Sequence, residues 1–182
     1  MSKEIKYKLF KPIATDKRLT FNEKLVAMFV YTLNYSGCTC TATNNYIANN
    51  LNITEDSVEI AVKRLEKYCL IKDSRTNSHI GYIEVCNTHI CEKKFYIFQS
   101  DVLKSNLCLS SKFLLVYVQS FKRKDFMFFT QKNNLKENIG LTTQYQIKSA
   151  LKELLDLKLL REFNNAFEGT YYRLYKNINT IN

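Results

Sequence analysis

Apolar positions along this chain follow a helical period in several segments, and these segments form two equivalent series. Spacings of i, i+3 and i+4 predict helices over residues 21–34, 44–50, 55–68, 110–121, 131–138 and 143–156. Apolar runs on either side of a polar turn predict a hairpin after each series, with strands over residues 70–72, 80–85, 159–163 and 170–175. Single short strands are expected over residues 7–10, 94–98 and 126–129. The pattern therefore predicts an α+β fold that is mainly α, with small β hairpins.

The two series repeat one another at an offset of 88 to 89 residues. Residues 51–54 (LNIT) correspond to 139–142 (IGLT), and residues 61–65 (AVKRL) correspond to 150–154 (ALKEL). A repeat of this length is too long for a solenoid unit and is typical of a duplicated small domain. We therefore expect two tandem domains, at residues 1–92 and 93–182.

Local signals mark where the predicted helices begin and end. Thr20 is expected to be the N-cap of the first helix, and Glu23, three residues later, completes a capping box. The N-caps of later helices are expected to be the threonines Thr43, Thr54 and Thr130. Asn52 and Gly140 hold equivalent positions in the two series, between the second and third helices, and both residue types tolerate a left-handed backbone.

Helical spacing also assigns the buried positions. In the first series these are Leu25, Met28, Phe29, Thr32, Tyr46, Ile47, Leu51, Val58, Ala61, Val62 and Leu65. In the third helix of the second series they are Ile147, Ala150, Leu151 and Leu154. Pro12 is expected to end the first strand and to lie in a turn before the first helix.

Three helices followed by a hairpin is the order of a winged helix, and two motifs carry a resemblance. Residues 47–65 read IAxxLNITxxSVxxAxxxL, and residues 135–142 read LxxxIGLT. Both resemble winged helix-turn-helix proteins, in particular the N-terminal domains of plasmid and phage replication initiators or replisome organisers. The resemblance implies two tandem winged helix-turn-helix domains that bind double-stranded DNA at repeated or inverted sites, often as dimers. It implies a mobile-element protein, and leaves replication initiation and transcription or transfer regulation both open.

The net charge supports a polyanionic partner. The chain carries 27 basic and 17 acidic residues, for a formal charge of +10. The excess is spread over both halves, with +4 up to Phe98 and +6 after it. A basic protein of this kind favours nucleic acid or another anionic surface.

The third helix of the second series is the expected DNA reader. A helix-turn-helix places the exposed face of this helix in the major groove, where glutamine can pair with adenine and lysine can meet phosphate. Further basic residues lie on the second helix, in the loop before it and on the hairpin, and Arg75 of the first hairpin is another candidate. The expected DNA-binding residues are Thr142, Thr143, Gln144, Tyr145, Lys148, Lys152, Lys132, Lys136, Arg161, Arg173, Lys122, Arg123 and Lys124.

The equivalent face in the first series is acidic. Glu55, Asp56 and Glu59 suit the positive end of a helix dipole, but they would repel phosphates in a groove. We therefore expect the first domain to be the weaker DNA reader and to face a protein partner or form a homodimer. This face also leaves open an inhibitor of a host nucleic-acid enzyme, such as an anti-CRISPR protein that binds a Cas nuclease.

Other chemistry has little support in the sequence. The six cysteines are expected to be reduced thiols, and neither their spacing nor the two histidines suit a metal site. Phosphate-loop and hydrolase motifs do not occur, so we expect no enzyme activity, cofactor or small-molecule substrate. With no apolar run of about 20 residues and no signal peptide, we expect a cytoplasmic protein without membrane contact.

Overall fold

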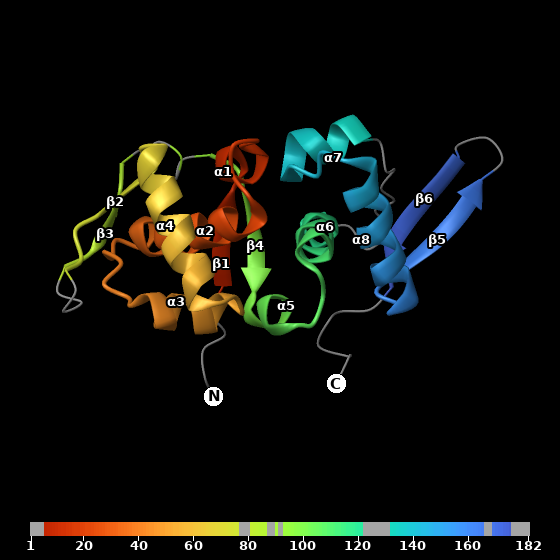
Figure 1. Cartoon of the computed structure of the whole chain (residues 1–182). Coiled ribbons are helices and arrows are strands. Elements are labelled where there is room, and N and C mark those ends of the chain that lie inside the picture. Colours follow the sequence, from red (N-terminus) through yellow and green to blue (C-terminus); the bar gives the residue numbers. More distant parts are fainter. Residues whose placement is uncertain are drawn as a thin grey trace. The chain divides into compact units, whose positions relative to one another are not determined.

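The structure of this chain, a computed structural model, describes residues 6–76, 81–86, 90, 93–121, 132–165 and 169–175 (Figure 1). It has the expected α+β fold, with helices and small antiparallel sheets. The chain forms two compact units, Met1–Lys104 (unit 1) and Ser105–Asn182 (unit 2). The boundary expected after residue 92 precedes a strand that pairs within unit 1, so the compact units divide later in the chain.

Unit 1 holds helices around one central helix, with one two-stranded sheet that joins its first and last strands and a second that follows its fourth helix. Its elements are β1 (Lys6–Phe10), α1 (Lys11–Thr15), α2 (Phe21–Tyr35), α3 (Asn44–Leu51), α4 (Glu55–Lys67), β2 (Ile71–Asp73), β3 (Ile83–Val85), β4 (Phe95–Gln99) and α5 (Ser100–Lys104). β1 pairs antiparallel with β4, and β2 pairs antiparallel with β3. The β1–β4 pairing joins segments that are far apart in sequence.

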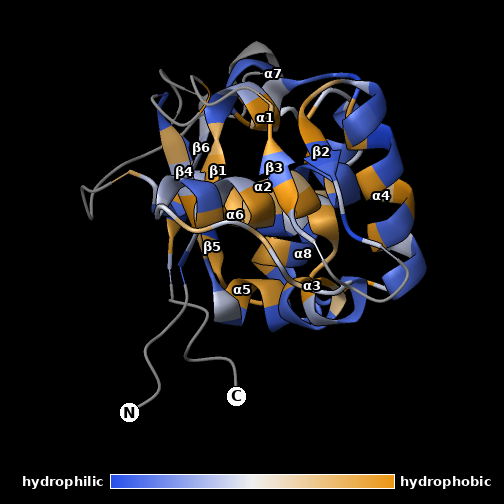
Figure 2. Ribbon diagram, turned by 90° about the vertical axis from the view of Figure 1, so that its left-hand side faces the viewer, coloured by the Kyte–Doolittle hydropathy of each residue, from blue (hydrophilic) through white to orange (hydrophobic). Residues whose placement is uncertain are grey.

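The central helix α2 is buried around its whole circumference, which its sequence spacing did not predict. Residues 23–32 are all buried, including Glu23 and Lys24. The reason is that β1, β3, α1, α3 and α4 all pack against this helix. By contrast, α4 is apolar on one side and hydrophilic on the other (Figure 2).

Unit 2 repeats the middle of unit 1. Its described elements are α6 (Leu109–Gln119), α7 (Lys132–Ile139), α8 (Gln144–Asp156), β5 (Leu160–Asn165) and β6 (Gly169–Leu174). They follow the order of α2, α3, α4, β2 and β3, and β5 pairs antiparallel with β6. The expected strand at 126–129 and the expected cap Thr130 lie outside the described residues.

The repeat extends to individual backbone conformations. Asn52 (φ 54°) and Gly140 (φ 72°) are both left-handed, at equivalent places before α4 and α8. After these helices, Cys69 and Lys158 both have φ 54°. The next amide bonds back into the helix in each unit, from Leu70 to Leu65 at 3.0 Å and from Leu159 to Leu154 at 2.9 Å. Each helix therefore ends with the same cap before its hairpin.

The predicted N-terminal caps in the described residues form as expected. Thr20 Oγ1 accepts the Glu23 amide at 3.4 Å and Glu23 Oε2 accepts the Thr20 amide at 2.9 Å, which completes the capping box. Thr43 and Thr54 cap α3 and α4 through their hydroxyl oxygens. A second capping box on α8 was not predicted from the sequence.

Three local predictions were incomplete or wrong. Pro12 does not lie in a turn but in the first turn of α1, where its missing amide hydrogen costs nothing. Tyr46 is 55% exposed instead of buried, and Ala48 points inward beside Ile47. The short helix α5 had no signal that we read from the sequence.

α2 contacts α4 in unit 1, and α6 contacts α8 at the equivalent place in unit 2. The acidic residue at this contact lies on α2 in unit 1 but on α8 in unit 2. In unit 1, Glu23 of α2 also forms an ion pair with Arg64 of α4, with 3.1 Å between Glu23 Oε1 and Arg64 Nη1. In unit 2, the residue equivalent to Arg64 is Glu153, whose carboxylate accepts the amide of Cys108 at 3.1 and 3.2 Å. The carboxylate that completes the N-terminal cap thus comes from the third helix, because Cys108 offers no cap of its own.

Equivalent lysines next to these caps are buried in both units. Lys24 and Lys112 are each 3% exposed. Burial lowers the pKa of Lys24 to about 8, against the opposing effect of Asp16 and Glu23, and burial also lowers the pKa of Lys112. These lysines belong to the packing of each unit and are not available to a surface partner.

Candidate nucleic-acid interface

One face of α8 is left uncovered because its apolar positions all pack inward. Ile147, Ala150, Leu151 and Leu154 are buried, as the sequence predicts. The opposite side exposes Gln144, Tyr145, Lys148 and Lys152. Tyr145 is the most exposed large apolar side chain of the described residues, at 80%. We call these four residues the α8 outer face.

The threonines before α8 serve the helix itself. Thr143 is the N-cap: its Oγ1 accepts the Gln146 amide at 3.1 Å, and Gln146 Oε1 accepts the amides of Thr143 and Thr142. Thr143 remains exposed and Thr142 is half-buried. Both were predicted to contact DNA, and the structure gives both a capping role that fixes where α8 begins.

The lysines of the α8 outer face carry charge that nearby carboxylates do not neutralise. Neither Lys148 nor Lys152 forms an ion pair with any residue that the structure describes. Lys136 lies half-buried on α7, and Lys132 begins that helix. The predicted basic cluster Lys122, Arg123 and Lys124 lies outside the described residues.

The β5–β6 hairpin presents two arginines and two aromatic rings on its outer side. In the register, Arg161 lies opposite Arg173 and Phe163 lies opposite Tyr171. The two rings stack, with centroids 5.3 Å apart and planes 8° apart. Residues of the alternate set, Leu160 and Tyr172, are buried, so this set faces outward. We call these four residues the β5–β6 outer face.

The arrangement on this hairpin is electrostatically unusual. Like charges directly opposite each other destabilise an antiparallel pair, yet Arg161 and Arg173 have no carboxylate partner among the described residues. Their guanidinium carbons lie 5.3 and 5.5 Å from the centre of the Phe163 ring, whose negative face offsets part of the repulsion. The buried Nε of Arg173 has no hydrogen-bond partner in the described part of the chain.

Sequence reasoning identified the arginines but missed the aromatic pair. Phe163 stands two residues after Arg161, and Tyr171 stands two residues before Arg173. Period-two spacing places each ring on the same face as its arginine. That signal was present in the sequence, but only the strand register shows that the rings meet.

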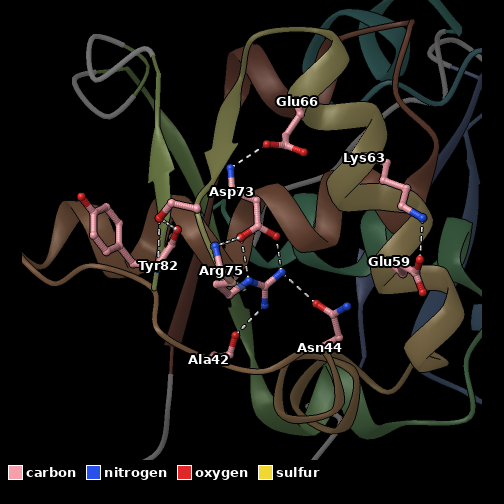
Figure 3. A network of polar contacts seen from close by, with 9 residues as sticks. Ala42, Asn44, Glu59, Lys63, Glu66, Asp73, Arg75 and Tyr82 are labelled. Carbon is pink, nitrogen blue, oxygen red and sulfur yellow. Dashed lines mark hydrogen bonds and ion pairs between the residues drawn. The ribbon is translucent and has the colours of Figure 1, made fainter. Parts of the chain in front are cut away.

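The described strands of the first hairpin do not carry such a face. Lys72 lies opposite Glu84 in the β2–β3 register, so charges of opposite sign meet. Arg75, considered as a backbone contact, is held in a network instead, with a side chain that is 8% exposed (Figure 3). It donates to Asp73 Oδ1 and Oδ2 at 2.8 and 2.6 Å, to the Ala42 carbonyl at 2.7 Å and to Asn44 Oδ1 at 2.9 Å. Arg75 therefore ties the hairpin to the start of α3.

The outer face of α4 is acidic at its start and partly self-neutralised. Glu55, Asp56 and Glu59 are exposed, as predicted. Glu59 pairs with Lys63 one turn later (Figure 3), and that hydrogen bond and charge lower the pKa of Glu59. Ile60 lies beside them at 59% exposure. This face would repel a phosphate backbone where α8 would attract it.

Comparison with protein-family models, with curated proteins and with solved structures finds no match to this chain. Among the described helices, none is long and apolar enough to cross a membrane. In the same residues, no three acidic, histidine or cysteine side chains gather as ligands for a metal ion. The chemistry of the exposed faces is therefore the basis for any functional proposal.

Proposed function

We propose that unit 2 binds double-stranded DNA through the α8 outer face and the β5–β6 outer face. The observation that carries the proposal is a set of cations that have no carboxylate partner among the described residues: Lys148, Lys152, Arg161 and Arg173. At the position of Lys148, the repeated helix α4 carries Glu59 instead. Since α8 and β5 pack against each other, both faces belong to one structural unit.

In this proposal each unit is a winged helix-turn-helix, with α7 and α8 as the helix-turn-helix of unit 2 and β5–β6 as its wing. The exposed face of α8 enters the major groove, and its first turn lies nearest the bases. Gln144 is placed to pair with a base such as adenine, while Lys148 and Lys152, one and two turns further along α8, contact phosphates. Arg161 and Arg173 together bind a backbone phosphate. The role we propose is replication initiation, or transcription or transfer regulation, in a mobile element.

Salt dependence of duplex binding tests this directly. Each phosphate contact contributes about 0.9 to the slope of log K against log salt, so Lys148→Ala with Lys152→Ala should lower the slope by about 1.8. The matched control is Lys63→Ala with Lys67→Ala on α4 of unit 1, which should leave the slope nearly unchanged. Fluorescence anisotropy with a labelled duplex measures both. Absence of binding at low salt, or an equal effect of the control, would overturn the assignment.

A second candidate function rests on the exposed Ile60 within the acidic face of α4. An apolar side chain among carboxylates suits a basic protein groove better than it suits DNA. In this alternative the protein inhibits a host nucleic-acid enzyme, such as a Cas nuclease, by occupying its nucleic-acid site. The test is DNA cleavage by a purified Cas nuclease with the wild-type chain and with Glu55→Lys/Glu59→Lys. Unimpaired cleavage with both would dismiss this alternative.

A further inference from the structure

The two edges of the β1–β4 sheet differ: α2 covers the β1 edge, and the β4 edge is open. The amide of Lys8 in β1 donates to Thr32 Oγ1 of α2 at 2.7 Å, so it points away from β4 and this edge is covered. Lys8 lies opposite Ile97. In an antiparallel ladder, two opposite residues either bond to each other or both point their backbone groups away from each other. The amide and carbonyl of Ile97 therefore also point away from β1.

The outward groups of β4 form a short open edge. The ladder alternates, so Phe95 and Gln99 project their backbone groups to the same side as Ile97. Lys11 and Lys94 follow the pair Phe10–Phe95, so in this alternation their backbone groups should point toward each other. The Lys11 amide does donate to the Lys94 carbonyl, at 2.7 Å. Within the described residues of unit 1, no hydrogen bond reaches the outward groups of Phe95 or Ile97, and α5 begins directly after Gln99.

This edge lacks the features by which proteins usually block pairing. β4 has no charged side chain, proline or bulge between Phe95 and Gln99. Ile97, at its centre, is 45% exposed. Its neighbours on the other face, Tyr96 and Phe98, are buried in unit 1.

We infer that β4 pairs antiparallel with β4 of a second copy of this chain, about a two-fold axis at Ile97. In this register Ile97 exchanges both hydrogen bonds with Ile97 of the other copy, and the Gln99 amide donates to the Phe95 carbonyl. Past the strand ends, the exposed Lys93 and Lys94 of one copy lie toward the end of β4 in the other copy, where α5 begins with the exposed Asp101 in its first turn. The strand is thus complementary to itself in charge as well as in backbone groups, which an isologous interface requires.

The result is a four-stranded sheet in the order β1-β4-β4-β1, built on unit 1. It does not rest on DNA binding by unit 2. Because each strand has five residues, the interface is small, and the dimer should form and dissociate with concentration. If unit 2 binds DNA, the two-fold axis would present two reading units and favour inverted repeats.

Sedimentation equilibrium over a range of concentrations tests the pairing. The wild-type chain should show a monomer–dimer equilibrium, and Ile97→Lys should abolish the dimer by placing like charges at the axis. Ile60→Lys is the matched control, because Ile60 is also an exposed isoleucine of unit 1, and it should leave the dimer intact. A wild-type chain that stays monomeric at every concentration, or a dimer that survives Ile97→Lys, would overturn the inference.

A charge exchange and an amide measurement make the test independent of folding effects. Lys93→Asp should weaken the dimer, and adding Asp101→Lys should restore it; failure to restore counts against the register. Hydrogen exchange followed by NMR should show the Ile97 amide exchanging rapidly in dilute protein and slowly in concentrated protein. Protection that is equal at all concentrations would mean that the edge is occupied within one chain, and the inference would be wrong.

Discussion

Replacing Arg75 by methionine should loosen the first hairpin, because one side chain joins that hairpin to α3. Arg75 donates two hydrogen bonds to Asp73, one to the Ala42 carbonyl and one to Asn44 Oδ1. Methionine keeps much of the length and apolar stem of the side chain but none of these donors. The Asp73 side chain is 17% exposed, so its carboxylate would lose its cation where water reaches it poorly.

The expected cost follows from this burial. Removing one partner of a buried ion pair costs about 3–5 kcal/mol. Partial exposure of Asp73 lets water replace some of the lost bonds, so we expect Arg75→Met to lower the free energy of unfolding by about 2–3 kcal/mol. Asp73→Ala combined with Arg75→Met should cost less than the two single changes added together, because the double variant leaves no unpaired carboxylate.

Urea unfolding followed by circular dichroism measures the effect, and Arg161→Met is the control. Arg161 lies on a hairpin strand, but its side chain has no hydrogen bond or ion pair in the described residues, so its replacement should change stability by less than about 0.5 kcal/mol. In duplex binding the order should be reversed: Arg161→Met should weaken binding more than Arg75→Met does. A loss below about 1 kcal/mol in Arg75→Met would refute the anchoring role. So would a binding defect in folded Arg75→Met as large as that of Arg161→Met.

The pH dependence provides a further check on the same contact. Burial alone would raise the pKa of Asp73, but hydrogen bonds from the Arg75 side chain and amide and its positive charge outweigh burial and lower the pKa below 3.8. The contribution of Asp73 is therefore complete above its unfolded pKa and is lost as the pH falls through the folded pKa. Arg75→Met should remove this loss of stability with acid.

Three further changes test other parts of the fold. Glu153→Gln should lower the stability of unit 2 by about 1 kcal/mol in urea unfolding, because the Cys108 amide loses a charged acceptor; an unchanged midpoint would contradict the shared cap. Lys24→Met should remove a rise in melting temperature between pH 8 and 10, because the folded pKa of about 8 lies below the ordinary 10.5 and the unfolded chain binds the extra proton; Lys63→Met, on an exposed lysine, should keep that rise. Lys158→Gly should stabilise the chain by about 0.5–1 kcal/mol by relieving a left-handed backbone, whereas Lys152→Gly within α8 should destabilise it by a similar amount.

Much of the local structure was predictable because its causes lie within a few residues. Thr20 and Glu23 form a capping box with their own backbone, and Asn52 takes the left-handed conformation that its short polar side chain tolerates. The buried positions of α4 and α8 follow from helical spacing, since each helix packs on one side only. The same spacing correctly predicted that Lys148 and Lys152 are exposed.

Surface chemistry was harder to predict, because it depends on which charges find partners. Arg75 and Arg161 look alike in sequence, as arginines in or beside a hairpin strand. The fold brings Asn44 and the Ala42 carbonyl to Arg75, and it brings a second arginine and the Phe163 ring to Arg161. One arginine is thereby used for stability and the other is left for a partner.

The order of the longer helices and the hairpins, the described helix caps of unit 1 and the duplicated pattern could be predicted from the sequence, because these depend on side-chain spacing and on bonds between near neighbours. Tertiary packing was needed to show that β4 joins β1, that α2 is enclosed on all sides and that Tyr46 is exposed. These outcomes depend on segments far apart in the chain that cover one another, and no local pattern records which face a distant segment will cover.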